Sequence, residues 1–303
     1  MSATSDQVQR LTITDIAKLH ADGTRIAMLT VYDYPTAKLL DEAGIPLLLV
    51  GDSLGRVMLG YENEIPVSMA DMLHHTSAVT RGARRAMVVA DMPFLSYATP
   101  EVGIENAGRF LSEAGAQAVK VEGGVRTART IETIVRSGIP VMGHIGWTPQ
   151  GSNSMGKVRV LGKSVDQARS LLADAHAVEE AGAFAIVLEL VPEQLAGAIT
   201  ERLRIPTIGI GAGAGCSGQV QVLTDLLGYD TWKPKHARAY ANLRQTILDA
   251  AQAYRADVEG GTFPGQAETV RMDEAVLAEV LGNSELDRPA APAGDAIPLD
   301  RDL

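Results

Sequence analysis

Short apolar runs recur along this chain and alternate with longer stretches whose apolar residues follow helical spacing. This alternation is typical of repeated βα units, in which parallel strands are buried beneath helices. Eight runs predict strands at 25–31, 46–50, 86–90, 118–121, 140–143, 183–188, 206–210 and, most weakly, 219–223. The clearest helical stretches are 71–81, 100–113, 125–136 and 165–180. Eight such units favour a single closed (β/α)8 TIM-type barrel over an open doubly wound sheet.

Composition narrows the class of protein. The chain is 46% hydrophobic but only 4% aromatic, which suits parallel strands built from aliphatic residues. A net charge of −10 argues against nucleic acid as a partner. No apolar run reaches the length of a membrane span, and the first residues lack the apolar core of a secretion signal. The single cysteine, Cys216, excludes an intrachain disulfide and fits a reducing compartment, so we expect a cytoplasmic protein.

The ends of the chain differ from its middle. No linker divides residues 10–282, which we therefore predict to form one barrel domain. Residues 1–9 and 283–303 offer little apolar surface to bury, and the second of these segments is rich in proline and alanine. Both are predicted to be disordered.

Polar residues stand where the predicted strands end. In a (β/α)8 barrel the active site lies at the carboxyl ends of the strands, so these side chains should meet at one mouth. They are Asp52, Ser53, Asp91, Lys120, Glu122, His144 and Glu189. Their placement on consecutive strands is difficult to obtain from helix capping alone.

Each of these residues also has a purely structural interpretation. Asp52 could cap a helix, and Asp91 could form an Asx-type turn. Lys120 and Glu122 share one strand face by the two-residue period and could simply pair with each other. Glu189, between two leucines, could belong to a structural salt bridge or, in dry surroundings, act as a general base.

His144 could ligate a metal, bind a substrate or satisfy a hydrogen bond in the core, and these three alternatives stay open.

The acidic residues at the strand ends favour a hard cation as a ligand of this site. Two strand-end aspartates without a cysteine nearby favour an ion that prefers oxygen ligands. Magnesium fits best, because one or two carboxylates often hold it while it keeps waters and substrate oxygens.

The strand-end motifs resemble those of the ketopantoate hydroxymethyltransferase family. The similarity runs in order from about Leu11 to Pro264 and includes these segments: Thr30-Val-Tyr-Asp-Tyr34, Val50-Gly-Asp-Ser-Leu-Gly55, Ala90-Asp-Met-Pro-Phe94, Val119-Lys-Val-Glu-Gly-Gly124, Gly143-His-Ile-Gly146, Thr148-Pro-Gln150, Val187-Leu-Glu-Leu-Val-Pro192 and Ile208-Gly-Ile-Gly-Ala-Gly213. So many separate matches make an accidental similarity improbable.

The resemblance implies an activity and a role for each residue. It implies a (β/α)8 barrel of the phosphoenolpyruvate mutase/isocitrate lyase kind. Such an enzyme transfers a hydroxymethyl group from 5,10-methylenetetrahydrofolate to 3-methyl-2-oxobutanoate, with an enolate that Mg2+ stabilises, in pantothenate synthesis. Asp52 and Asp91, with Glu122, would form the magnesium site and contact the chelated oxo acid. Ser53 and Lys120 would hold its carboxylate, and Glu189 would accept the proton. His144 lies in a matching motif near the substrate, and members usually form homo-oligomers, often decamers.

The late part of the chain departs from the family pattern. Ser217 stands where an aspartate is usual, and His236 stands where a phenylalanine is usual. These changes put the eighth βα unit, the folate contacts and the subunit packing in doubt. They leave the predicted metal ligands and base untouched.

Two rival functions remain at this point. One is a magnesium-dependent carbon–carbon or phosphorus–carbon lyase with the same barrel, which would want a reactive cysteine in a mobile loop. Cys216, in a glycine-rich loop, suits that role poorly. The other is a non-catalytic barrel, which should lack an essential acid, and here none of the four acids is missing.

Overall fold

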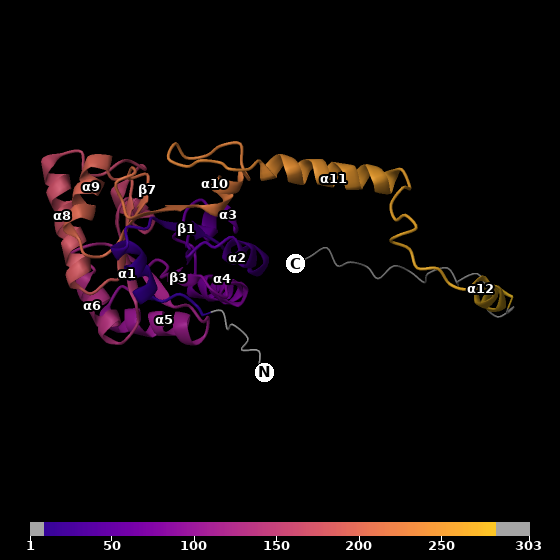
Figure 1. Ribbon diagram of the computed structural model, residues 1–303, viewed down its shortest axis with the longest axis horizontal. Coiled ribbons are helices and arrows are strands. Elements are labelled where there is room, and N and C mark those ends of the chain that lie inside the picture. The colour runs from indigo at the N-terminus through magenta and orange to yellow at the C-terminus, as the bar shows by residue number, and fades with distance from the viewer. Residues whose placement is uncertain (1–8, 283–303) are drawn as a thin grey trace, which may run out of the picture. The chain divides into compact units, whose positions relative to one another are not determined.

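The structure is a computed structural model that describes residues 9–282 (Figure 1). Eight parallel strands form a closed barrel in chain order, with β8 paired to β1. The strands are β1 Ile26–Thr30, β2 Leu47–Val50, β3 Met87–Asp91, β4 Ala118–Glu122, β5 Val141–Gly146, β6 Ala185–Glu189, β7 Thr207–Ile210 and β8 Gly218–Gln221. The predicted barrel is therefore confirmed. The doubtful eighth strand forms too, although its last predicted residue, Leu223, already begins a helix.

Helices cover the barrel. They are α1 Ile13–Ala21, α2 Tyr34–Glu42, α3 Leu54–Val57, α4 Met69–Gly82, α5 Pro100–Ser112, α6 Ala128–Arg136, α7 Ser152–Met155, α8 Val165–Glu180, α9 Glu193–Arg202 and α10 Leu223–Leu227, with a 3-10 turn, η1, at Pro149–Gly151. Three of the four predicted long helices match within two residues at each end. The exception is α6, which begins three residues after position 125, because Val125 donates its backbone N–H to Asp174 and Thr127 turns back onto Gly124.

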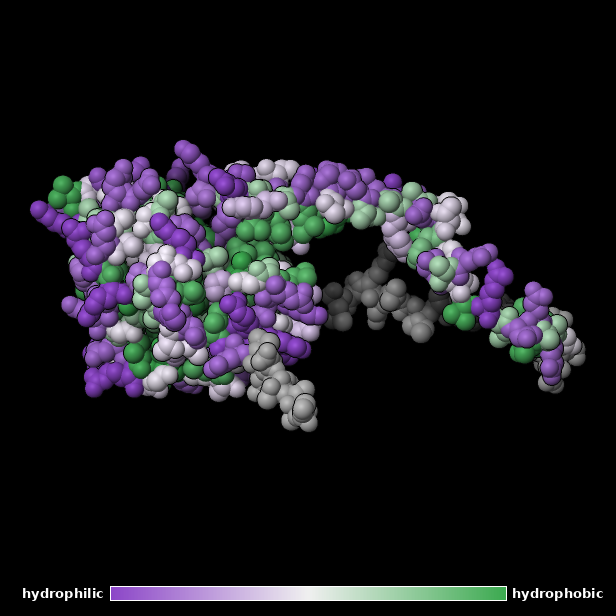
Figure 2. All heavy atoms as spheres, in the orientation of Figure 1, coloured by the Kyte–Doolittle hydropathy of each residue, from purple (hydrophilic) through white to green (hydrophobic). Residues whose placement is uncertain are grey.

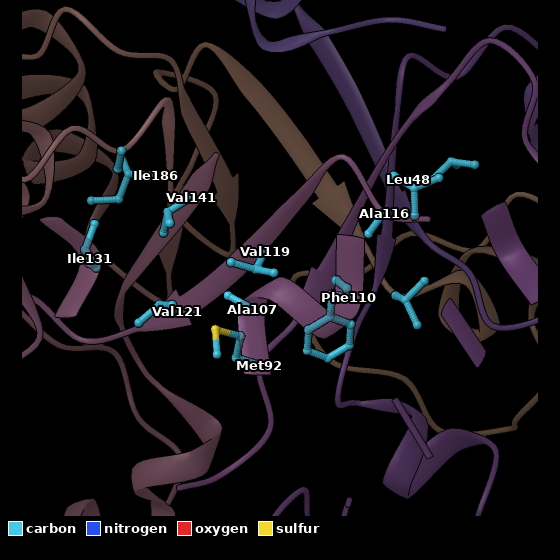
Figure 3. Packing of buried hydrophobic residues seen from close by; sticks show 14 of the residues in the cluster. Leu48, Met92, Ala107, Phe110, Ala116, Val119, Val121, Ile131, Val141 and Ile186 are labelled. Carbon is cyan, nitrogen blue, oxygen red and sulfur yellow. The ribbon is translucent and has the colours of Figure 1, made fainter. Parts of the chain in front are cut away.

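Two apolar clusters hold the barrel together. The larger lies between the strands and the helices and includes Phe110, Ile131 and Ile186 (Figure 3). The smaller fills the barrel interior with residues such as Met28 and Met142, and Ile16 of α1 joins it. A closed, densely filled barrel is a rigid support, so the side chains at its strand ends are held in fixed relative positions.

The chain divides into two compact units, Met1–Arg244 and Gln245–Leu303. The second unit contains most of α11, Leu243–Glu259, and all of α12, Glu274–Leu281. Neither helix has a buried residue, and several of their large apolar side chains are exposed, including Ile247, Tyr254 and Leu281. Figure 2 shows hydrophobic residues among the hydrophilic ones at the surface. The single-domain assignment of 10–282 stays a prediction, and the tail predicted from 283 lies outside the described residues.

Candidate active site

The barrel brings the predicted polar residues together at one mouth. Asp52 and Ser53 follow β2, Asp91 ends β3, Lys120 and Glu122 lie on β4, His144 lies on β5, and Glu189 ends β6. Strand register aligns neighbours, since Asp91 is paired with Lys120 and Glu122 with His144. Asp52, Asp91, Lys120, Glu122 and His144 are almost fully buried, whereas the Glu189 side chain is 18% exposed.

Lys120 lies at the centre of this cluster. Its Nζ donates to His144 Nδ1 at 2.9 Å and lies 3.3 Å from Asp91 Oδ1. Glu122 Oε1 is farther away, at 3.9 Å, so simple pairing within β4 does not account for Lys120. Burial by itself lowers the pKa of Lys120, but the carboxylates of Asp91, Glu122 and Asp52 outweigh it and raise the pKa. The ammonium therefore stays charged inside the mouth.

The contacts of His144 fix its protonation. An ammonium group can only donate, so Nδ1 accepts from Lys120 and the ring proton lies on Nε2. Burial and then Lys120 lower the pKa of His144, which keeps the imidazole neutral. Nε2 lies 3.3 Å from Glu189 Oε2, although not in good hydrogen-bond geometry. Lys120, His144 and Glu189 thus form one polar chain across three strands.

Asp52 and Asp91 are held by partners far away in the sequence. Asp91 Oδ2 accepts from the backbone N–H of Asp52 at 3.0 Å, and this bond links the ends of β2 and β3. Asp91 therefore makes a long-range contact instead of a local Asx turn. Asp52 Oδ2 accepts from Gln150 Nε2 at 2.7 Å. The helix that follows, α3, begins at Leu54 with Ser53 as its N-cap, so Asp52 does not cap it. Neither the helix cap proposed for Asp52 nor the Asx turn proposed for Asp91 forms, and each carboxylate instead contacts a residue distant in the sequence.

Ser53 belongs to a second hydrogen-bonded chain. Its Oγ lies 2.9 Å from the hydroxyl of the buried Tyr32, which donates to Thr30 Oγ1 at 2.8 Å. A side chain at Gly51 would meet Ser53 Oγ at 2.7 Å, so it would displace the Ser53 hydroxyl from its present position. The opposite side of the mouth uses glycine in the same way, because a Cβ at Gly146 would collide with the backbone oxygen of Glu189.

The sequence patterns predict no role for Gln150 or Tyr97. Gln150 is buried on η1 and donates its backbone N–H to Glu122 Oε2 at 3.1 Å, besides its bond to Asp52. Tyr97 donates its hydroxyl to Gln150 Oε1 at 2.6 Å. Gln150 thus orients two of the three predicted metal ligands. The Thr148-Pro-Gln150 motif marked its position, but only the three-dimensional contacts reveal its partners.

The mouth holds more negative than positive charge. Asp52, Asp91, Glu122 and Glu189 face one ammonium, that of Lys120, beside a neutral imidazole. Burial, followed by the effect of neighbouring carboxylates, raises the pKa of Asp52 to about 7 and that of Glu122 to about 7. Burial also raises the pKa of Asp91 to about 6. A further cation in the mouth would favour the ionised forms of Asp52, Asp91 and Glu122.

A divalent cation held by few carboxylates fits this cluster. Asp91 Oδ1 and Glu122 Oε1 are buried and have no hydrogen-bond partner within the described part of the chain. Among residues 9–282, no three His, Cys, Asp or Glu side chains converge closely enough to enclose a metal ion by themselves. Magnesium accepts such a partial set, because waters and substrate oxygens complete its shell. Asp52 and Asp91, together with Glu122, are the residues that would hold such an ion.

These raised pKa values predict how chelated protein responds to pH. Folding raises the pKa values of these three carboxyl groups, so the folded state binds more protons than the unfolded state. The protonated carboxyl groups therefore contribute fully to the free energy of unfolding below about pH 4. That contribution is lost as the pH rises through about 6 to 7. Magnesium should offset that loss and raise Tm by about 5–10 °C at pH 8 at saturation, and by much less at pH 5. Thermal unfolding with and without Mg2+ measures this, and an equal shift at both pH values would contradict it.

Solved structures of other proteins have a similar fold. Phosphonopyruvate hydrolase, solved with oxalate and Mg++, matches with a TM-score of 0.56 over 91% of this chain and 97% of its own, at 12% identity. Phosphoenolpyruvate phosphomutase from Streptomyces platensis subsp. rosaceus matches with a TM-score of 0.57 over 91% and 97%, at 15% identity. At these identities the likeness shows the fold alone, a closed (β/α)8 barrel, as predicted.

Sequence comparison then defines the family. The model of the ketopantoate hydroxymethyltransferase family matches residues 10–266. The 3-methyl-2-oxobutanoate hydroxymethyltransferase of Chloroflexus aurantiacus (strain ATCC 29366 / DSM 635 / J-10-fl) is 59% identical over 91% of this chain and 98% of its own. That of Gluconacetobacter diazotrophicus is 51% identical over 90% and 99%. The chain belongs to the ketopantoate hydroxymethyltransferase family and is a transferase, which disfavours both the lyase and the non-catalytic alternative.

Proposed function

We propose that this enzyme transfers a hydroxymethyl group from 5,10-methylenetetrahydrofolate to 3-methyl-2-oxobutanoate, giving 2-dehydropantoate for pantothenate and coenzyme A synthesis. With one water, the products are 2-dehydropantoate and tetrahydrofolate, so carbon, oxygen and charge balance. The observation that carries this proposal is the Lys120–His144–Glu189 chain beside an acidic, buried mouth. It places a partly accessible carboxylate next to groups that can fix an oxo acid.

Each residue of the mouth has a separate role in the proposed reaction. Lys120 holds the substrate carboxylate by charge, and Ser53 donates its hydroxyl to that carboxylate by turning it away from Tyr32. Bound magnesium would withdraw electrons from the 2-oxo group and so acidify the C3 hydrogen. Glu189 removes that hydrogen as a proton, and its 18% exposure leaves it accessible to substrate. His144 is neutral, and its Nε2–H lies 3.3 Å from the Glu189 carboxylate, where it can donate to the bound acid.

The remaining features of the proposal concern the whole protein. We propose that it works in the cytoplasm as a homo-oligomer, a decamer by family resemblance, with residues 10–282 as its catalytic part. None of the described helices is long and apolar enough to cross a membrane. The net charge of −10 repels small anionic substrates except where a metal and Lys120 offset it. The same negative charge disfavours nucleic acid as a partner.

One assay tests this function directly. Purified protein is incubated with 3-methyl-2-oxobutanoate, Mg2+ and the folate donor labelled in its methylene group, and the products are identified by mass spectrometry. We expect labelled 2-dehydropantoate together with tetrahydrofolate. Cleavage of the oxo acid, or absence of the labelled product at any metal concentration, would contradict the proposal.

A further inference from the structure

A hollow of about 410 Å3 opens beside the acidic cluster, on the side of β3, β4 and β5. Its inner wall includes Glu122 and Gln150, which also belong to the cluster. Its other walls come from the loop after β3, the start of α6 and the segment after η1. The volume lies in the range of small-molecule sites, which is roughly 300–1,000 Å3. Ser53, Lys120 and Glu189 do not line it. It is therefore a second site that adjoins the place of the oxo acid.

The inner wall of the hollow is rigid. Gln150 donates to Asp52 at 2.7 Å and to the backbone oxygen of Met92 at 2.9 Å, and it accepts from Tyr97 at 2.6 Å. Burial raises the pKa of Tyr97, so its hydroxyl remains a donor. A ligand in the hollow can thus lie against Tyr97 and Gln150 without displacing a group that the cluster needs. Such a ligand would be next to the oxo acid, as transfer of a carbon between two bound substrates requires.

The outer wall of the hollow is apolar and exposed. Phe94 is 40% exposed and Leu95 is 63% exposed, and both line the hollow. Leu95 has a φ of 64°, in the left-handed region that a leucine rarely adopts. A strained backbone that presents two large apolar side chains at a cavity rim is characteristic of a binding loop. This wall suits the face of a flat ring system.

The remaining wall supplies charge and hydrogen bonds. Arg126 lines the hollow and forms no ion pair with any residue in 9–282 at N···O distances up to 4.0 Å. Asn153 and Ser154 line it as well, with amide and hydroxyl groups. In a chain of net charge −10, an unpaired arginine at a cavity rim favours an anionic ligand. The hollow therefore combines an apolar face, a hydrogen-bonding edge and one cation.

We propose that this hollow binds the folate donor of the transfer, a site that rests on the proposed function. The fused ring lies against Phe94, Leu95 and Tyr97, and its polar edge faces Asn153 and Ser154. Arg126 binds a carboxylate of the glutamate tail. The donor's methylene carbon then approaches the oxo acid from the side of Glu122 and Gln150, while Glu189 takes the proton from the other side of the mouth.

The test separates the two substrates. Arg126→Leu should raise the KM for 5,10-methylenetetrahydrofolate about tenfold, because it removes an exposed charge-assisted contact. The KM for 3-methyl-2-oxobutanoate should stay unchanged. A donor without the glutamate tail should bind both proteins equally weakly, since it lacks the group that Arg126 recognises. Phe94→Ser should weaken both donors alike. The matched control is Arg129→Leu, three residues further along the chain on α6, exposed and outside the hollow, which should leave every constant unchanged.

Direct binding makes this test independent of turnover. Titration calorimetry with tetrahydrofolate should give a Kd about tenfold higher for Arg126→Leu than for the wild type and for Arg129→Leu. Equal Kd values for the three proteins would overturn the proposal. So would a change in the KM of the oxo acid with no change in the KM of the donor, since the hollow would then hold the other substrate. Failure of the proposed function gives a different result, namely no labelled product from the wild type.

Discussion

Asp91→Ala should reduce turnover by at least about 10³-fold at any substrate concentration. Asp91 contacts both Lys120, at 3.3 Å, and the backbone N–H of Asp52, at 3.0 Å. Removing one partner of a buried ion pair costs about 3–5 kcal/mol, equivalent to roughly 10²–10³-fold or more in an equilibrium or rate. Loss of a proposed metal ligand adds to this, so more substrate cannot restore the rate.

Two measurements check the Asp91 prediction. Steady-state kinetics give kcat, and titration calorimetry with Mg2+ gives the metal affinity, which should fall in parallel. Asp22→Ala is the matched control, because Asp22 forms only a surface pair with Lys18 and should leave both values unchanged. Undiminished activity of the wild type after thorough chelation, or normal metal binding by the variant, would contradict the metal assignment.

Most of the fold follows from local sequence patterns. Apolar runs alternating with amphipathic stretches predicted the barrel, because strand and helix periods are properties of neighbouring residues. The polar residues at the strand ends, such as Asp91 and Glu189, could be predicted to converge, because parallel strands in a barrel end at one face. The start of α6 could not be predicted from local patterns, because it depends on a hydrogen bond between Val125 and Asp174, which are 49 residues apart.

The contacts within the site could not be predicted in the same way. Gln150 and Asp52 are 98 residues apart, and no local pattern indicates that the amide of one orients the carboxylate of the other. The tautomer of His144 likewise depends on Lys120, which is 24 residues away on the neighbouring strand. Motif resemblance marked these positions, but their chemistry depends on distances that only the folded barrel sets. The hollow beside Gln150 left no signal in the sequence for the same reason.

Glu189→Gln should slow removal of the C3 proton by about 10²–10⁴-fold, or roughly 3–5 kcal/mol of barrier, as expected for loss of a positioned base. Proton removal needs no folate, so the wild type should exchange the C3 hydrogen of 3-methyl-2-oxobutanoate with deuterium oxide in the presence of Mg2+ alone. Glutamine keeps the size of Glu189 and can still contact His144 Nε2, but it cannot accept the proton.

Binding and exchange measured together make the Glu189 prediction decisive. The variant should bind the oxo acid almost normally, because Ser53, Lys120 and the acidic cluster are untouched. NMR follows the exchange, and calorimetry follows the binding. Glu180→Gln, at the exposed end of α8, is the matched control and should exchange at the wild-type rate. Exchange at that rate in Glu189→Gln would make Glu189 structural and His144 the next candidate base. Loss of oxo acid binding would instead show that Glu189 holds the site together, since His144 would then have lost the carboxylate that faces its Nε2.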